Sequence, residues 1–123
     1  MDLTLLPLEV DGLSIRPATE GRSLRFTWTG RSTARDPGAS LVPYFLGALY
    51  QVAAGTTIEM DFQAVEYFNS STIGSLIYLV EEARRQSVPL VFVYDRRLKW
   101  QELSFAPLRV LRDQSGLFQL RTA

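Results

Sequence analysis

The sequence predicts a single α/β domain over residues 1–123, with a mixed, mostly parallel sheet of four to five strands and crossover helices packed against it. Three segments lead to this prediction. Residues 57–62 alternate polar and apolar side chains, as a strand with one buried face does. Residues 73–84 carry apolar side chains at helical spacing. Residues 90–94 are an uninterrupted apolar run, which is typical of a strand buried on both faces in a helix-covered parallel sheet.

The composition is that of one globular domain with enough length for a hydrophobic core, since 46% of the 123 residues are hydrophobic and 21% are charged. Thirteen basic and thirteen acidic residues balance to a net charge of zero, which gives no reason to expect a nucleic-acid partner. The chain contains neither cysteine nor histidine, so it lacks the usual thiolate nucleophile and the commonest general base and metal ligand. We therefore expect no catalytic residue, no metal site and no cofactor.

The hydropathy pattern bears on location. No apolar run approaches the roughly 20 residues of a membrane-spanning helix. Residues 1–7 lack the basic start of a secretory signal. We expect a cytoplasmic protein without a membrane span.

The first strands of the predicted sheet are short. Residues 3–8 are apolar but interrupted by Pro7, so residues 1–10 are interpreted as an edge strand or a loosely held terminus. Residues 13–15 and 24–28 are predicted to be two strands joined by a turn at residues 19–22. Residues 30–40 are rich in Gly, Ser and Thr and contain Asp-Pro-Gly, which predicts a loop.

A first amphipathic helix is predicted after this loop, with Ser40 as its N-cap and Pro43 in its first turn. Gly55 would end it at the C′ position, where glycine accepts a left-handed backbone conformation. The apolar side chains at helical spacing are Tyr44, Phe45, Ala48, Leu49 and Val52.

The second helix begins where the strand period changes, between Asn69 and Thr72. Any of Asn69, Ser70 and Ser71 can accept a hydrogen bond from the first helical amides as the N-cap. Arg84 continues the apolar stripe at its last turn, where its long side chain can reach solvent. The predicted inward positions are Ile73, Leu76, Ile77 and Val80, and the predicted outward positions are Ser71, Ser75, Tyr78, Glu82 and Gln86, with Leu79 at the border.

The C-terminal part of the chain is predicted to add a helix and a short last strand. Residues 95–97 end the strand at 90–94, and residues 98–104 form one or two helical turns. Ser104 would cap a final helix that has Pro107 in its first turn and Gly116 at its C′ end. Residues 117–120 would then form a short strand or pack under the sheet.

Two separated segments carry a family resemblance. Residues 67–76 read Y-F-N-S-S-T-I-G-S-L, and residues 111–120 read L-R-D-Q-S-G-L-F-Q-L. The first resembles the signature of the STAS domain, the family of bacterial anti-sigma-factor antagonists, and the second resembles the closing helix and S-G-L-F turn of that family. The likeness covers about residues 11–120 and departs from the signature at Asn69, where the family has aspartate, and at Thr72, where it has glycine. Compared with the closing pattern of the family, the chain has extra residues around residues 95–103.

The resemblance implies a STAS-like α/β fold and a role in partner switching. Ser70 occupies the position of the serine that is phosphorylated in the family, and Ser71 is the second candidate. The implied partners are a serine kinase that doubles as an anti-sigma factor and a phosphatase that resets the switch. The chain would then be a substrate and binder rather than an enzyme. The residues expected to contact the partner are Asn69, Ser71, Thr72, Ser75, Tyr78 and Leu79.

Other interpretations use the same residues. The adjacent serines can simply be part of a helix cap. A hydrolase would need an aspartate, glutamate or lysine as the base for Ser70 or Ser71, and the G-x-S-x-G nucleophile elbow is absent. The charged side chains of residues 81–85 are expected to form a solvated, charge-paired helix end. A STAS domain can also act as an unphosphorylated scaffold or ligand-sensing module in a larger signalling or transport complex, which the departures at Asn69 and Thr72 keep open.

Overall fold

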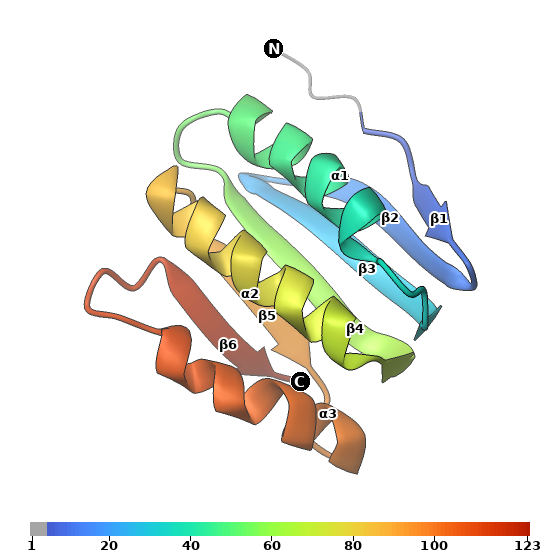
Figure 1. The fold of residues 1–123 in the computed structure, drawn as a ribbon. Helices are drawn as coiled ribbons and strands as arrows, with labels where there is room; N and C mark the ends of the chain where they lie inside the picture. Colours follow the sequence, from blue (N-terminus) through green and yellow to red (C-terminus); the bar gives the residue numbers. More distant parts are fainter. Residues whose placement is uncertain (1–4) are drawn as a thin grey trace.

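The computed structural model describes residues 5–123 of the chain, which form strands and helices packed in two layers (Figure 1). In chain order the elements are β1 (Leu8–Val10), β2 (Leu13–Glu20), β3 (Ser23–Ser32), α1 (Gly38–Gln51), β4 (Thr57–Phe68), α2 (Ser70–Arg85), β5 (Leu90–Tyr94), α3 (Lys99–Phe105), the 3₁₀ helix η1 (Ala106–Leu111) and β6 (Phe118–Thr122). The α/β class and the crossover helices are therefore as the sequence predicts.

The sheet is larger than predicted and partly antiparallel. Within residues 5–123 it has six strands in the order β1-β2-β3-β4-β5-β6, not four to five. The strands β1, β2 and β3 form an antiparallel meander, whereas β3 to β6 are parallel. The three-residue β1 is too short to show a hydrophobic period, so its pairing with β2 decides between the edge strand and the loosely held terminus that the sequence allows.

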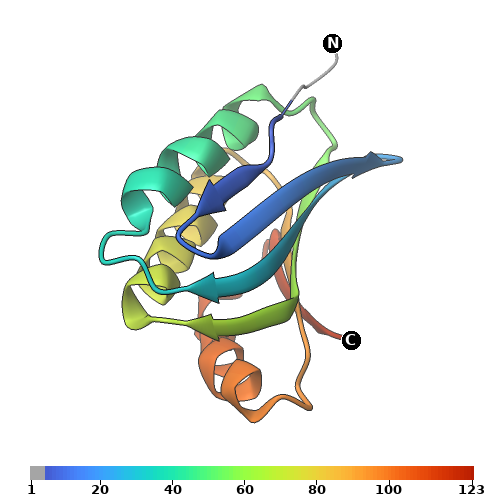
Figure 2. The same cartoon turned by 90° about the vertical axis from the view of Figure 1, so that its right-hand side faces the viewer.

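All of the helices lie on one face of the sheet, as the edge-on view in Figure 2 shows. The parallel strands β3 to β6 follow one another in chain order. Right-handed crossovers that always step in the same direction place every helix on the same face. The opposite face is not covered by any helix of the described residues.

The side chains of β5 are buried on both faces of the sheet, as the apolar run predicts. On the face away from the helices, however, the expected layer of helices is not what buries them. Val91 and Val93 alternate with the side chains that face the helices and are nevertheless buried. Beside them, Glu59 of β4 pairs with Arg25 of β3 at 2.8 Å and with Arg121 of β6 at 3.7 Å. Because β5 lies between β4 and β6, the second ion pair spans it.

The hydrophobic core lies between the sheet and the helices and is centred on Phe62 of β4. Its ring centroid is 4.9 Å from that of Trp28 in β3, 5.1 Å from that of Phe92 in β5 and 4.8 Å from that of Phe105 in α3. Trp28 in turn stacks on Phe45 of α1 at 5.4 Å. Aromatic pairs bury large apolar surfaces, so this chain of rings joins α1 and α3 to the sheet on either side of α2.

The N-terminal elements differ from prediction mainly in their ends. β2 and β3 extend beyond the predicted residues 13–15 and 24–28, and β3 takes in the first part of the predicted loop. Gly30 lies inside β3 with φ +93°, where a Cβ would collide with the carbonyl oxygen of Gly12. The edge strand expected within residues 1–10 is β1, and residues 1–4 lie outside the described part of the chain.

Helix α1 starts earlier than predicted, because Gly38 of the Asp-Pro-Gly segment is already its first residue. The N-cap position is Pro37, so Ser40 and Pro43 lie inside the helix rather than at its cap and first turn. The helix ends at Gln51 with Val52 as the C-cap residue. Gly55, the predicted C′ residue, has φ +87° in the following turn.

The C-terminal helical segment is also shifted. Helix α3 begins at Lys99, so Ser104 lies within it and does not cap a later helix. Pro107 stands at the start of η1, which ends at Leu111, before the predicted helix end at Gly116. Gly116 has φ +70° in the turn that leads into β6, and the predicted last strand is present as Phe118–Thr122.

Candidate functional site

The candidate site is the start of α2, immediately after β4 ends at Phe68. Of the three predicted cap residues, Asn69 is the N-cap: its backbone is extended and its Oδ1 accepts a hydrogen bond from the Thr72 N–H at 2.9 Å. Its own N–H donates to the Ser32 carbonyl at 3.0 Å. Asn69 therefore joins the end of β3 to the first turn of α2.

A buried hydrogen-bond network extends from this cap. The Asn69 Nδ2 donates to the Ala34 carbonyl at 2.8 Å, and the Thr72 hydroxyl donates to Asn69 Oδ1 at 2.7 Å. Because the single hydroxyl proton of Thr72 is used in that bond, the Ser32 hydroxyl must donate to Thr72 Oγ1, which lies 2.6 Å away. The network holds the β3–α1 loop against the start of α2.

Ser70 and Ser71 are the first two residues of α2, and both are exposed. Neither serves as the cap, because Asn69 does. The backbone carbonyl of Ser71 accepts a hydrogen bond from the Ser75 hydroxyl at 3.2 Å. A helix start presents unpaired N–H groups and the positive end of the helix dipole, so the two hydroxyls stand where added negative charge is stabilised.

The predicted contact residues do not share one surface. Ser71 and Tyr78 are exposed, with Tyr78 at 43%, and Ser75 is half-buried. Thr72 and Leu79 are buried, at 0% and 1% exposure. The predicted border position of Leu79 is therefore wrong.

The cause is the position of α1, which packs along this side of α2. Glu82, predicted to face solvent, is also buried. It accepts a hydrogen bond from the Tyr50 hydroxyl of α1 at 3.2 Å and forms an ion pair with Arg85. The helical period predicts an apolar arc, but it does not show that a neighbouring helix covers one flank of it.

An apolar groove lies on the other flank of α2, and the sequence did not predict it. It runs between α2 and the α3–η1 segment with a volume of about 520 Å³. Ile73 and Ile77, predicted as core, are half-buried and line it, because they lie at the edge of the apolar arc. The described residues that line the groove are Phe68, Asn69, Ser70, Ile73, Ile77, Leu103, Ser104, Pro107, Leu108, Val110 and Leu111.

Arg84 links the C-terminal end of α2 to the end of η1 through a hydrogen bond and an ion pair. Its guanidinium donates a hydrogen bond to the Leu111 carbonyl, and its Nε lies 2.9 Å from Asp113 Oδ2. The sequence predicts that the Arg84 side chain reaches solvent, whereas in the structure it contacts residues at and after the end of η1. This contact holds the two walls of the groove together.

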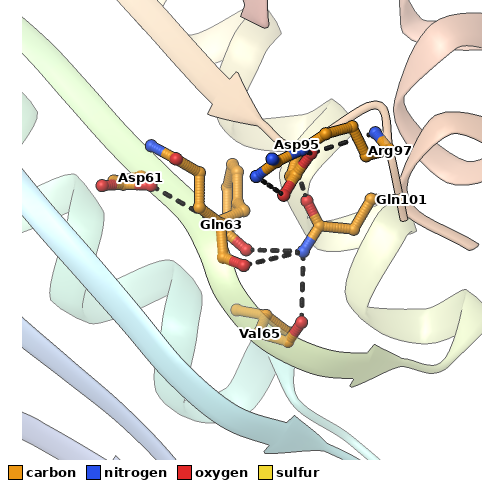
Figure 3. A network of polar contacts seen from close by, with 7 residues as sticks. Asp61, Gln63, Val65, Asp95, Arg97 and Gln101 are labelled. Carbon is orange, nitrogen blue, oxygen red and sulfur yellow. Dashed lines mark hydrogen bonds and ion pairs between the residues drawn. The ribbon is translucent and has the colours of Figure 1, made fainter. Parts of the chain in front are cut away.

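Residues 95–103 contain a second polar network, shown in Figure 3. Gln101 of α3 is fully buried, and its Nε2 donates to the carbonyl oxygens of Phe62 at 2.8 Å and Val65 at 3.1 Å. Its Oε1 accepts a hydrogen bond from the Asp95 N–H at 2.8 Å. β5 pairs with β4 only as far as Asp61, so the amide of Gln101 takes the place of a neighbouring strand for the next carbonyls of β4.

Asp95 closes this network at the end of β5. Its carboxylate accepts hydrogen bonds from the Nε and Nη2 of Arg97, both at 3.0 Å, and from the Arg97 N–H. The hydrogen bond from the Arg97 guanidinium is the main reason that the pKa of Asp95 lies below its ordinary value. The sequence gives no sign that Gln101 is buried and bonded in this way, because a single polar residue in a short helix is common.

Within residues 5–123 no cluster of three or more His, Cys, Asp or Glu side chains is arranged to hold a metal ion. No helix in the same part of the chain is long and apolar enough to cross a membrane.

Comparison with known proteins adds no further identification. No protein family matches the chain, and no curated protein matches it. The resemblance to STAS domains therefore stays a prediction from residues 67–76 and 111–120 of the sequence.

Proposed function

We propose that this chain is a STAS-like, phospho-switchable interaction domain that acts as an anti-sigma-factor antagonist in the cytoplasm. A serine kinase that doubles as an anti-sigma factor binds it and phosphorylates Ser70, and a phosphatase removes the phosphate. In this function the chain is a substrate and binder, not an enzyme. The observation that carries the proposal is that Ser70 is exposed at the first position of α2 while Asn69 supplies the helix cap.

This division of roles lets a phosphate be added without damage to the fold. A phosphoserine carries about −1.5 to −2 charges at neutral pH. The helix start stabilises such a charge through its dipole and free N–H groups. The cap and its network use Asn69, Thr72 and Ser32, so none of their hydrogen bonds has to break.

The consequence of phosphorylation falls on the partner. A surface that packs over the start of α2 would have to remove water from a dianion, and the cost of that desolvation weakens the complex. Ser70 is preferred over Ser71 because Ser70 also lines the apolar groove. Ser71 remains the second candidate, since it is equally exposed.

The test is to map phosphate on protein purified from its own host and on protein incubated with the cognate kinase and ATP. We expect phosphate on the peptide that contains Ser70, lost in Ser70→Ala and retained in Ser71→Ala. Ser71 is the matched control because it is the adjacent exposed serine of the same turn. Labelling that persists in Ser70→Ala would contradict the assignment.

A second candidate is a STAS-like domain that works unphosphorylated, as a scaffold or ligand-sensing module in a larger complex. The amide of Asn69 favours it, because the family signature has a carboxylate beside the acceptor serine. Absence of phosphate from both serines in the presence of active kinase would support this candidate.

A further inference from the structure

The edges of the sheet differ in how far they are protected from pairing with another chain. An edge strand presents a row of unpaired N–H and carbonyl groups that can accept a further strand. Within residues 5–123 the main edges of this kind belong to β1, to β2 beyond Ile15, to β4 beyond Asp61 and to β6. In Figure 1, β6 is the outermost strand on the side opposite to β1.

Three of these edges are short or blocked. β1 has three residues and directly follows Pro7. The part of β2 beyond Ile15 contains Pro17, which has no N–H to donate to another strand. The part of β4 beyond Asp61 is covered by Gln101, which donates to two of its carbonyl oxygens. Only β6 then offers a complete edge in the described part of the chain.

The backbone groups that β6 leaves free can be assigned from its pairing with β5. The Ala123 N–H donates to the Tyr94 carbonyl at 3.0 Å, and the Leu117 carbonyl accepts from the Leu90 N–H at 2.8 Å. In a parallel pair, every second residue of a strand directs both backbone groups to the same neighbour. The residues of β6 that direct their N–H and carbonyl groups away from β5 are therefore Phe118, Leu120 and Thr122.

This row of groups is complementary to a second copy of itself. When two β6 strands run antiparallel about a twofold axis at Leu120, that residue faces its own copy and Phe118 faces Thr122 of the second copy. Residues that face each other in this way exchange both of their backbone hydrogen bonds. A shift of the axis by one residue in either direction leaves Phe118 or Thr122 without a partner in the other strand.

The side chains favour the same register. Leu120 lies on the helix side of the sheet but is only half-buried at the edge, so contact with its own copy would bury more of it. On the outer face, Arg121 would lie opposite Gln119 of the second copy, whose amide oxygen can accept from the guanidinium. An axis at Arg121 would instead set two arginines opposite each other, which is destabilising.

We infer that β6 pairs antiparallel with β6 of a second copy of this chain, with Leu120 on the twofold axis, so that two sheets join into one. The contact is closed by its symmetry, since each copy uses the same strand. Two strands of five residues, about 17 Å long, bury less surface than a standard stable interface. The dimer is therefore weak and reversible. This inference does not rest on the proposed phospho-switch.

The first test is sedimentation equilibrium at micromolar to millimolar concentrations, where we expect a monomer–dimer equilibrium. Leu120→Pro removes the outward N–H at the centre of the contact and none of the hydrogen bonds to β5. It should stay monomeric throughout this range. Leu120→Ala is the matched control, because it loses the same apolar side chain but keeps the N–H, and it should still dimerise. Circular dichroism checks that both variants fold.

A second test keeps the backbone intact and probes the register. Gln119→Arg places a like charge opposite Arg121 of the second copy and should weaken the dimer severalfold. Adding Arg121→Glu to Gln119→Arg sets opposite charges against each other and should restore dimerisation to at least the parent level. If Gln119→Arg dimerises as tightly as the parent, the register with Leu120 on the axis is wrong.

A third test uses the absence of cysteine from the chain. Leu120→Cys would place two thiols opposite each other at a Cα separation of about 5.5 Å, within the range of a disulfide. Mild oxidation should link this variant into a covalent dimer much faster than Ala18→Cys, which is exposed on the other side of the sheet. Equal rates of linkage would mean that the thiols meet only by random collision, which contradicts the inference.

Two further outcomes overturn the inference. A parent protein that is monomeric at millimolar concentration does not pair through β6. A dimer that Leu120→Pro leaves intact must use another surface. Neither outcome bears on phosphorylation of Ser70, because β6 contains none of the residues that cap or start α2. Absence of Ser70 labelling, in turn, would leave the dimer standing.

Discussion

The side-chain oxygen of Asn69 accepts two hydrogen bonds from Thr72, one from its backbone N–H at 2.9 Å and one from its hydroxyl at 2.7 Å. These are the two residues at which the segment that resembles the STAS signature differs from it, so the two differences contact each other. The amide of Asn69 also donates to the Ala34 carbonyl, a bond that an aspartate carboxylate cannot make. A glycine at position 72 would likewise supply no hydroxyl for Asn69 or Ser32.

The first prediction concerns this pair. Thr72→Val keeps the shape of a fully buried side chain but leaves the Ser32 hydroxyl without its acceptor and Asn69 Oδ1 with one donor fewer. We expect the free energy of unfolding to fall by about 1–3 kcal/mol, the usual cost of an unsatisfied buried polar group. Urea unfolding measures it. Ser71→Ala, one residue away and exposed, should stay within about 0.5 kcal/mol of the parent. Equal stabilities for both variants would show that the network contributes little.

The second prediction concerns Gln101. Gln101→Leu fills the same space but removes the donor to the Phe62 and Val65 carbonyls and the acceptor of the Asp95 N–H. We expect a loss of about 3 kcal/mol, because several buried backbone groups lose their partner at once. Thermal and urea unfolding measure it, with the exposed Gln119→Leu as the control. A Gln101→Leu protein as stable as this control would mean that water replaces the amide.

The third prediction separates two neighbours on α2. Leu79→Ala should lower the free energy of unfolding by about 2–5 kcal/mol, since it empties a fully buried position in the core. Tyr78→Ala should change it by about 0.5 kcal/mol or less, as an exposed substitution does. Chemical unfolding of both variants under one set of conditions tests the burial that α1 imposes. Reversed magnitudes would mean that α2 is rotated about its axis.

The fourth prediction concerns stability in acid. The Arg97 guanidinium holds the pKa of Asp95 below its ordinary value, so the ionised carboxylate is favoured in the folded state. The resulting stabilisation is fully present above the ordinary aspartate pKa of about 3.9 and is lost as the pH falls below it, toward the lower folded pKa. Urea unfolding between pH 2 and 7 should therefore show a difference between the parent and Asp95→Asn that narrows below about pH 4. In an Arg97→Gln background this difference should depend much less on pH. An Arg97→Gln protein that loses stability in acid as the parent does would contradict the pairing of Arg97 with Asp95.

Local pattern determined much of the central part of this protein. The alternation in residues 57–62, the apolar spacing in residues 73–84 and the continuous run at residues 90–94 predicted β4, α2 and β5 in the right places. The switch of period between Asn69 and Thr72 located the start of α2, because a cap depends on residues within a few positions of one another. Such short-range preferences can be read from neighbouring residues alone.

Only the tertiary structure decided which surfaces these elements leave free. The sequence places Leu79 at the border of the apolar arc of α2 and Ile73 inside it, yet Leu79 is buried and Ile73 is partly open at the groove. Gln101 donates hydrogen bonds to carbonyls 36 and 39 positions earlier in the chain. These carbonyls belong to the part of β4 that lies beyond the end of its pairing with β5. The period of a helix describes its own faces, whereas burial and hydrogen-bond partners of this kind depend on distant segments that meet only when the sheet and its helices have packed.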